Sequence, residues 1–152
     1  MLTLAFDTTA DCCAIALLHD NKIVEKFSEE MDFGQAETLM PQIQKMLQSQ
    51  NLTFTDLNLL AVCIGPGSFT GVRSSIAAAR AFGLACPNLK VTGVTAFEAY
   101  AHSLDMSELS DYNAVIIETK RADFYFQLFN GRLEKLCDAE ALPYEEIISR
   151  LK

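Results

Sequence analysis

A glycine-rich segment at residues 65–71 has the composition of an anion-binding loop. Its sequence, Gly-Pro-Gly-Ser-Phe-Thr-Gly, precedes an alanine-rich helical pattern, and backbone N–H groups at the start of a helix can hold a phosphate or a carboxylate. The segment lacks the Gly-Lys-Ser/Thr sequence of a Walker loop. We therefore favour a structural interpretation, in which Ser68 or Thr70 caps the helix and Gly67 and Gly71 adopt positive φ angles. The glycines of this structural loop are Gly65, Gly67 and Gly71.

Only two histidines, His19 and His102, are available for acid–base catalysis or metal binding. They lie in different expected elements, and neither a His-Glu-x-x-His nor a His-x-x-x-His pair occurs. The candidate nucleophiles Cys12-Cys13 and Ser74-Ser75 have no histidine near them in the sequence, whereas a nucleophile needs a base and an orienting acid. The sequence predicts no catalytic residue, no metal ligand and no cofactor site.

The cysteines and the hydropathy pattern indicate a cytoplasmic protein. The five cysteines are odd in number, lie mostly in apolar segments and form no Cys-x-x-Cys pair, so we interpret them as reduced core residues. No apolar run approaches the ~20 residues that a membrane-spanning helix needs. The N-terminus enters a strand pattern without a charged leader region. We expect no membrane association.

Strand and helix patterns alternate in an order that predicts an α/β fold. In the first part the expected strands are residues 2–7, 12–18, 22–28, 57–65 and 91–94, and the expected helices are residues 36–48, 72–85 and 96–104. The order βββαβαβα is followed by expected strands at 112–119, 123–130 and 132–139 and by a helix at 143–152. Polar residues at 108–111 and the renewed strand order predict two parts, residues 1–108 and residues 109–152.

The charge balance argues against independent binding to nucleic acid. The chain of 152 residues has 12 Lys and Arg against 20 Asp and Glu, a formal net charge of -8. Clustered basic residues that neutralise phosphates supply most of the affinity for nucleic acid. We therefore expect that this chain does not bind tRNA, or any other polyanion, by itself.

Three segments resemble the TsaB (YeaZ) family: Leu-Ala-Phe-Asp-Thr-Thr at 4–9, the stretch from Ile64 to Ala85, and the stretch from Val115 to Phe129. The middle segment is the specific one, because it joins Gly-Pro-Gly-Ser-Phe-Thr-Gly-Val-Arg to an alanine-rich helix and is followed by Thr-Gly-Val-Thr-Ala-Phe-Glu-Ala. The resemblance covers nearly the whole chain. It implies the actin/hexokinase/Hsp70-like fold, a ribonuclease H-like architecture with two duplicated βββαβα lobes. It also implies a complete N-terminal lobe and a truncated second lobe.

The chain departs at three sites from the pattern that the resemblance leads us to expect. Thr9 stands where nucleotide-binding members of the wider fold have the glycine of an Asp-x-Gly-x-Thr hairpin, Gln35 replaces a histidine, and Glu118-Thr119-Lys120 replaces Asp-Ala-Arg. A β-branched residue hinders the close approach of a phosphate to backbone amides. We therefore predict a hydrogen-bonded turn at Asp7-Thr8-Thr9 and no bound nucleotide.

The resemblance also implies a function, that of a non-catalytic subunit in the synthesis of threonylcarbamoyladenosine in tRNA. Its expected partner is a TsaD-like transferase, which has a histidine pair where this chain has Ala96 and Tyr100. Contact is expected through helices of the N-terminal lobe, with a TsaE-like ATPase joining the complex and a homodimer forming through the same face when TsaD is absent. The residues expected at this interface are Met40, Ile43, Met46, Arg73, Ile76 and Arg80.

Two other functions fit the same residues. A homodimeric structural protein unrelated to tRNA would use the same apolar helices. A small hydrolase or a kinase-like enzyme of the same fold would need ATP or a metal between complete lobes. Association with a TsaD-like partner distinguishes the non-catalytic subunit from these two alternatives.

Overall fold

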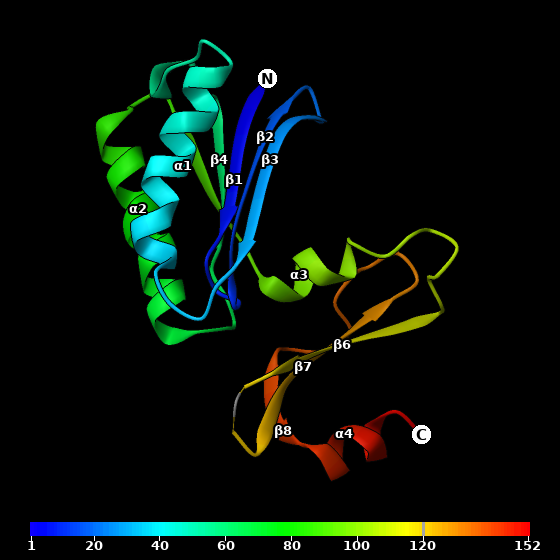
Figure 1. Cartoon of the computed structure of the whole chain (residues 1–152). Helices are drawn as coiled ribbons and strands as arrows, with labels where there is room; N and C mark the ends of the chain where they lie inside the picture. The colour runs from blue at the N-terminus through cyan, green and yellow to red at the C-terminus, as the bar shows by residue number, and fades with distance from the viewer. Residues whose placement is uncertain (120) are drawn as a thin grey trace. The chain divides into compact units, whose positions relative to one another are not determined.

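Strand β1 (Leu2–Asp7) lies at the centre of a mixed five-stranded sheet in the computed structural model (Figure 1). It pairs antiparallel with β2 (Cys12–His19) and parallel with β4 (Leu59–Cys63). The edges are β3 (Lys22–Glu30) and β5 (Lys90–Val94), which gives the order β3-β2-β1-β4-β5. The predicted order of strands and helices in this part of the chain is confirmed.

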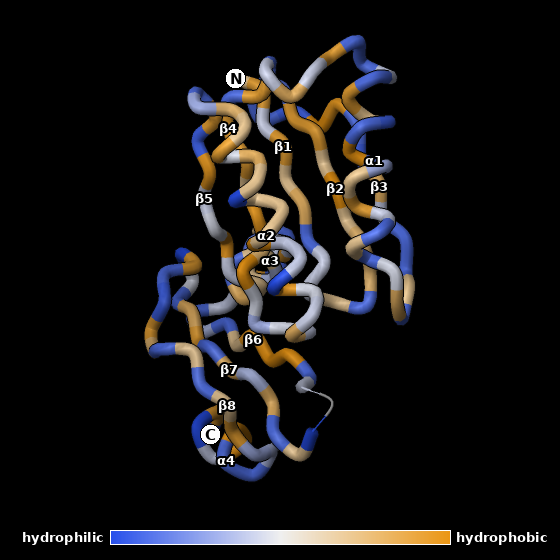
Figure 2. Tube along the Cα trace, turned by 90° about the vertical axis from the view of Figure 1, so that its left-hand side faces the viewer, coloured by the Kyte–Doolittle hydropathy of each residue, from blue (hydrophilic) through white to orange (hydrophobic). Residues whose placement is uncertain are grey.

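Helices α1 (Gln35–Ser49) and α2 (Phe69–Ala85) cover the same face of this sheet (Figure 1). The strands alternate buried and half-buried residues, as a sheet with one covered face does. Figure 2 shows hydrophilic and hydrophobic positions alternating along α1, whereas α2 is pale to orange over most of its length. The core beneath the helices contains Leu4, Phe6, Ile15, Leu17, Leu39, Ile43, Met46, Leu60, Ala79 and Phe82.

The structure describes residues 1–119 and 121–152, which form two compact units, Met1–Val94 and Thr95–Lys152. The sequence-based division at residue 108 assigned α3 (Ala96–Ala101) to the first part. In the structure this helix falls in the second unit, because Phe97 and Ala101 pack in a core cluster with residues of the strands that follow. The polar stretch at 108–111 marks a loop inside the second unit.

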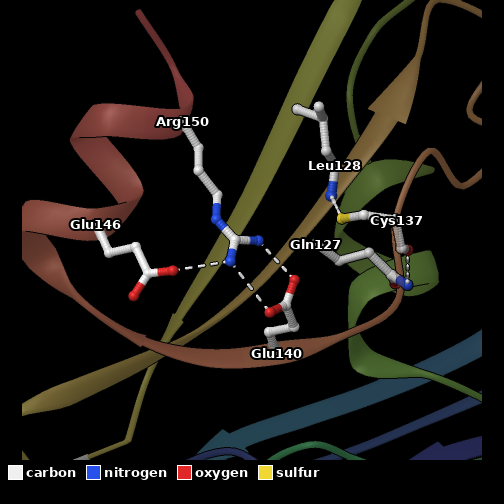
Figure 3. Close-up of polar contacts among 6 residues, drawn as sticks. All are labelled: Gln127, Leu128, Cys137, Glu140, Glu146 and Arg150. Atoms are coloured by element: carbon white, nitrogen blue, oxygen red, sulfur yellow. Dashed lines mark hydrogen bonds and ion pairs between the residues drawn. The ribbon is translucent and has the colours of Figure 1, made fainter.

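The second unit contains a three-stranded antiparallel sheet of order β6-β7-β8. Its strands are β6 (Tyr112–Glu118), β7 (Asp123–Asn130) and β8 (Glu140–Pro143), and they are followed by α4 (Tyr144–Arg150). Figure 3 shows how the end of α4 is tied to β8: Arg150 contacts Glu140 at 2.5 Å and Glu146 at 2.8 Å. The predicted helix after Pro143 is confirmed.

The strand predicted at residues 132–139 is wrong. Apart from one isolated bridge between Phe129 and Lys135, these residues belong to no strand. The Oδ1 atom of Asn130 accepts the N–H groups of Arg132 and Glu134 at 2.8 and 2.9 Å. This side-chain acceptor holds the segment in a turn, since Asn competes with strand pairing for backbone donors.

Candidate functional site

The glycine-rich loop and the Asp7-Thr8-Thr9 segment form one hydrogen-bonded junction. The N–H of Ser68 donates to the carbonyl oxygen of Thr9 at 2.7 Å. The Thr8 hydroxyl donates to the carbonyl oxygen of Gly71 at 2.8 Å and lies 2.8 Å from the hydroxyl of Ser75. The first residues of α2 are therefore fixed directly against the end of β1. The predicted hydrogen-bonded turn at this place is confirmed, with the N–H of Thr9 donating to Asp7 at 2.6 Å.

The glycines of the loop are needed mainly for close approach of two backbone segments. A Cβ atom on Gly67 would overlap the carbonyl oxygen of Thr9, and one on Gly71 would overlap that of Thr8. The positive φ angles predicted for Gly67 and Gly71 are wrong, because of the three loop glycines only Gly65 has one, at 88°. Local sequence could not show whether a glycine is required by a positive φ angle or by close approach of another segment. The atoms that a Cβ would overlap belong to Thr8 and Thr9, far away in the sequence.

The polar groups at this junction are largely engaged by the chain itself. Ser68 caps α2, as predicted, by accepting the N–H of Gly71 at 3.3 Å, and the N–H of Val72 donates to the carbonyl oxygen of Ser68. Thr8 and Thr9 are 0% and 3% exposed. The N–H groups of Ser68, Gly71 and Val72, which an anion at this helix start could use, thus already have internal acceptors.

The histidines and cysteines do not form an activated group. His19 is exposed and lies 3.7 Å from Asp20, and His102 is exposed after the end of α3. Burial raises the pKa of Cys63, and burial together with neighbouring Cys12 raises the pKa of Cys13 to about 11. Both thiols are therefore poor nucleophiles at neutral pH. Within residues 1–119 and 121–152 no group of three or more His, Cys, Asp or Glu side chains is arranged to hold a metal ion.

Two of the residues expected at the partner interface belong to the core instead. Ile43 is 0% exposed and Met46 is 2% exposed, and both pack between α1 and the sheet. Helical spacing placed them on the apolar face of α1 correctly, but that face covers its own sheet. Met40, three residues before Ile43 in the same helix, is 43% exposed.

The outer surface of α2 carries a row of exposed residues, here called the α2 stripe. The stripe consists of Phe69, Arg73, Ala77, Arg80 and Leu84. Their spacings of three and four residues place them on one side of the helix. Phe69 is 76% exposed and Leu84 is 85% exposed, and the guanidinium of Arg73 lies 5.3 Å from the centre of the Phe69 ring.

The other residues expected at the interface remain accessible to different degrees, and the interface itself stays a prediction. Arg73 and Arg80 are exposed and Ile76 is half-buried beside them. Phe69 and Leu84 were missed from sequence, although their spacing from the two arginines was a readable signal. Gln35, which replaces a histidine of the family pattern, donates its side-chain amide to the carbonyl oxygen of Met31 at 2.8 Å. In the segment Glu118-Thr119-Lys120, which also departs from that pattern, Lys120 lies outside the described residues.

Comparison with known proteins identifies the family. The family model described as "TsaD: tRNA N6-adenosine threonylcarbamoyltransferase" matches residues 33–144. The tRNA threonylcarbamoyladenosine biosynthesis protein TsaB of Buchnera aphidicola subsp. Baizongia pistaciae is 29% identical over 154 residues, covering 97% of this chain and 68% of that protein. TsaB of Haemophilus influenzae is 30% identical, covering 90% of this chain and 64% of that protein. The chain belongs to the TsaB (YeaZ) family.

The structural comparison confirms the fold. YeaZ from Pseudomonas aeruginosa superposes with a TM-score of 0.79 at 24% identity, covering 93% of this chain and 67% of that one. The predicted α/β class is thereby confirmed, and the chain shares the fold of that protein. This TsaB family member spans about two thirds of the length of these relatives. Among the residues that the structure describes, no helix is both long and apolar enough to cross a membrane.

Proposed function

We propose that this chain is a non-catalytic subunit that assembles with a TsaD-like transferase in the synthesis of threonylcarbamoyladenosine in tRNA. The relatives are named as proteins of that biosynthesis. The single observation that carries the proposed role is the exposed α2 stripe. Large apolar side chains at such exposure mark contact surfaces when they form a continuous patch.

The dimensions and chemistry of the α2 stripe suit a helical partner. Phe69 and Leu84 are fifteen residues apart in α2, which corresponds to about 22 Å at the rise of an α-helix. Ala77 and Ala81 lie exposed between them, and small residues allow another helix to approach closely. Aromatic and arginine side chains, represented by Phe69 and Arg73, are the types that contribute most to protein interfaces. Met40 adds an adaptable apolar contact from α1.

The junction at Thr8 and Thr9 supports a role without catalysis. Its buried hydroxyls and its backbone donors hold α2 against β1, so the helix that carries the stripe is rigidly placed. A rigid scaffold presents an interface at a lower entropic cost than a mobile one. In this arrangement the transferase supplies the reacting groups and this chain supplies a fixed surface.

The rest of the proposed assembly rests on the charge of the chain, on its cysteines and on the resemblance to the TsaB family. The net charge of -8 favours a complex in which other subunits hold the tRNA. A TsaE-like ATPase joins through the complex, and a homodimer forms through the α2 stripe when TsaD is absent. Five free cysteines fit a reducing compartment, the cytoplasm.

Co-purification with a TsaD-like transferase from the same organism tests the proposal. The wild-type chain should form a stable complex on size-exclusion chromatography, and Leu84→Asp should not, because the charge would be desolvated at the interface. Ile23→Asp is the matched control, since Ile23 is 62% exposed on β3, outside the α2 stripe. Failure of the wild-type chain to bind, or equal loss with both variants, would contradict the proposed role.

A further inference from the structure

A mainly apolar groove of about 260 Å³ lies between α2 and β5 in the first unit. Its walls include Ile64, Ile76, Arg80, Gly83, Val91 and Gly93. Two glycines keep it open: a Cβ on Gly83 would lie 3.3 Å from Cγ2 of Val91, and one on Gly93 would lie 2.9 Å from Cγ2 of Ile64. Ile64 and Val91 are each 44% exposed, so apolar surface remains accessible in the groove.

One wall of this groove is the free edge of β5. Within the described sheet, β5 has β4 as its single neighbour. Lys90 donates its N–H to the carbonyl oxygen of Asn58, the residue before β4, at 3.0 Å. Peptide groups of successive residues point to opposite sides of a strand, so those of Val91 and Gly93 point away from β4. They are placed to pair with another extended segment.

The two edges of the sheet differ in how they are protected. The edge strand β3 carries five charged residues, Lys22, Glu25, Lys26, Glu29 and Glu30. Charged side chains on an edge strand discourage pairing with another chain. In β5 the sequence is Lys-Val-Thr-Gly-Val, with its one charge at the first position. The β5 edge therefore lacks the protection that the β3 edge has.

The charge around the groove specifies the occupant. Residues 57–94 contain three basic residues, Arg73, Arg80 and Lys90, and no Asp or Glu, although the whole chain has 20 acidic residues against 12 basic ones. Arg80 lines the groove, and it forms no ion pair with any described residue. An anionic group next to an apolar side chain would complement this surface.

We infer that the free edge of β5 and the adjoining groove bind an extended acidic segment of a partner protein. The segment pairs with the peptide groups of Val91 and Gly93 as an added strand. It places an apolar side chain in the groove beside Ile76 and a carboxylate against Arg80. This inference does not rest on the proposed function, because it concerns the sheet edge and can be tested on the chain alone.

A fluorescein-labelled peptide of sequence Asp-Glu-Val-Leu-Val-Asp-Glu tests the inference by anisotropy titration against the full chain. We expect saturable binding that Arg80→Glu weakens by about tenfold or more, the effect of losing one charge pair. Val91→Pro should weaken it similarly, because it removes the N–H that points away from β4 and would pair with the peptide. Lys22→Glu, at the β3 edge, changes the net charge by the same amount as Arg80→Glu and should leave binding unchanged. Amide resonances of Val91 and Gly93 should shift on binding.

Several results would overturn the inference. These are absence of saturable binding up to about 1 mM peptide, equal binding by the Arg80→Glu and wild-type chains, or resonance shifts confined to other elements. A labelled oligothymidine of the same net charge is the comparison polyanion. If it binds as tightly as the peptide, the surface attracts anions in general and is not a strand-addition site. Circular dichroism of both variants establishes that a loss of binding is not a loss of folding.

Discussion

The carbonyl oxygen of Thr8 lies so close to the Cα of Gly71 that a methyl group at Gly71 would overlap it. The Thr8 hydroxyl also donates to the carbonyl oxygen of Gly71 at 2.8 Å. Both contacts join the end of β1 to the first turn of α2, across more than sixty residues of sequence. The position of the α2 stripe depends on this junction.

Gly71→Ala should lower the free energy of unfolding by about 2–3 kcal/mol, because the obstructing atoms are backbone and cannot rotate away. Urea denaturation followed by circular dichroism measures the change. Gly83→Ala is the matched control in the same helix: its Cβ would meet only the Val91 side chain, and the gain in helix propensity keeps its effect within about 1 kcal/mol. Equal stability of Gly71→Ala and wild type would refute the close-approach explanation.

Glu98 should make the second unit sensitive to acid. Hydrogen bonds from Lys135 and from Thr95 lower the pKa of its carboxyl from 4.5 to about 2. Because the folded pKa is depressed, the stabilisation is present above pH 4.5 and disappears as the pH falls from 4.5 toward 2. For this partly exposed group, solvent screening limits the contribution to about 1 kcal/mol.

The Glu98→Gln variant measures that contribution. Its unfolding free energy should be about 1 kcal/mol below that of wild type at neutral pH, and the two should converge as the pH falls toward 3. Lys135→Met should behave in the same way, since it removes the first cause of the shift. A deficit that stays constant from neutral pH to pH 3 would show that the charge of Glu98 does not contribute.

The cysteines should react with thiol reagents in an order set by burial. Cys13 and Cys63 are 0% and 6% exposed, and burial raises the pKa of both thiols, so little thiolate is available at pH 8. Cys86 and Cys137 are half-buried. Mass spectrometry of maleimide-treated native chain should find Cys13 and Cys63 labelled last. Early labelling of Cys13 would mean that β2 separates from the core under native conditions.

The sequence was sufficient where structure depends on near neighbours. The hairpin between β2 and β3 follows from alternating apolar residues around Asp20-Asn21, and both turn residues have the positive φ angles that such a turn requires, 48° and 65°. The cap of α2 was predicted as Ser68 or Thr70, and Ser68 is the one that forms, because α2 begins at Phe69, earlier than the predicted start at residue 72.

The sequence was insufficient where a distant segment decides the outcome. Spacing showed that Ile43 and Met46 share a face of α1, but only the sheet beneath them shows that this face is buried. In the same way, the obstacle to a side chain at Gly67 is the backbone of Thr9. The groove beside β5 also arises from three separate segments, so no local pattern indicated it.

The difference in exposure between two residues of α1 provides a final prediction about the proposed interface. Met40 is 43% exposed, whereas Ile43, one turn further along the same helix, is 0% exposed. Met40→Asp should therefore fold with a melting temperature near that of wild type and should weaken co-purification of the TsaD-like transferase. Ile43→Asp should unfold the first unit, because an unpaired buried carboxylate costs several kcal/mol. Thermal melting and size-exclusion chromatography with the transferase measure both effects. If Met40→Asp folds and binds as wild type does, while Leu84→Asp does not bind, the partner contacts α2 without α1 and the interface is narrower than proposed.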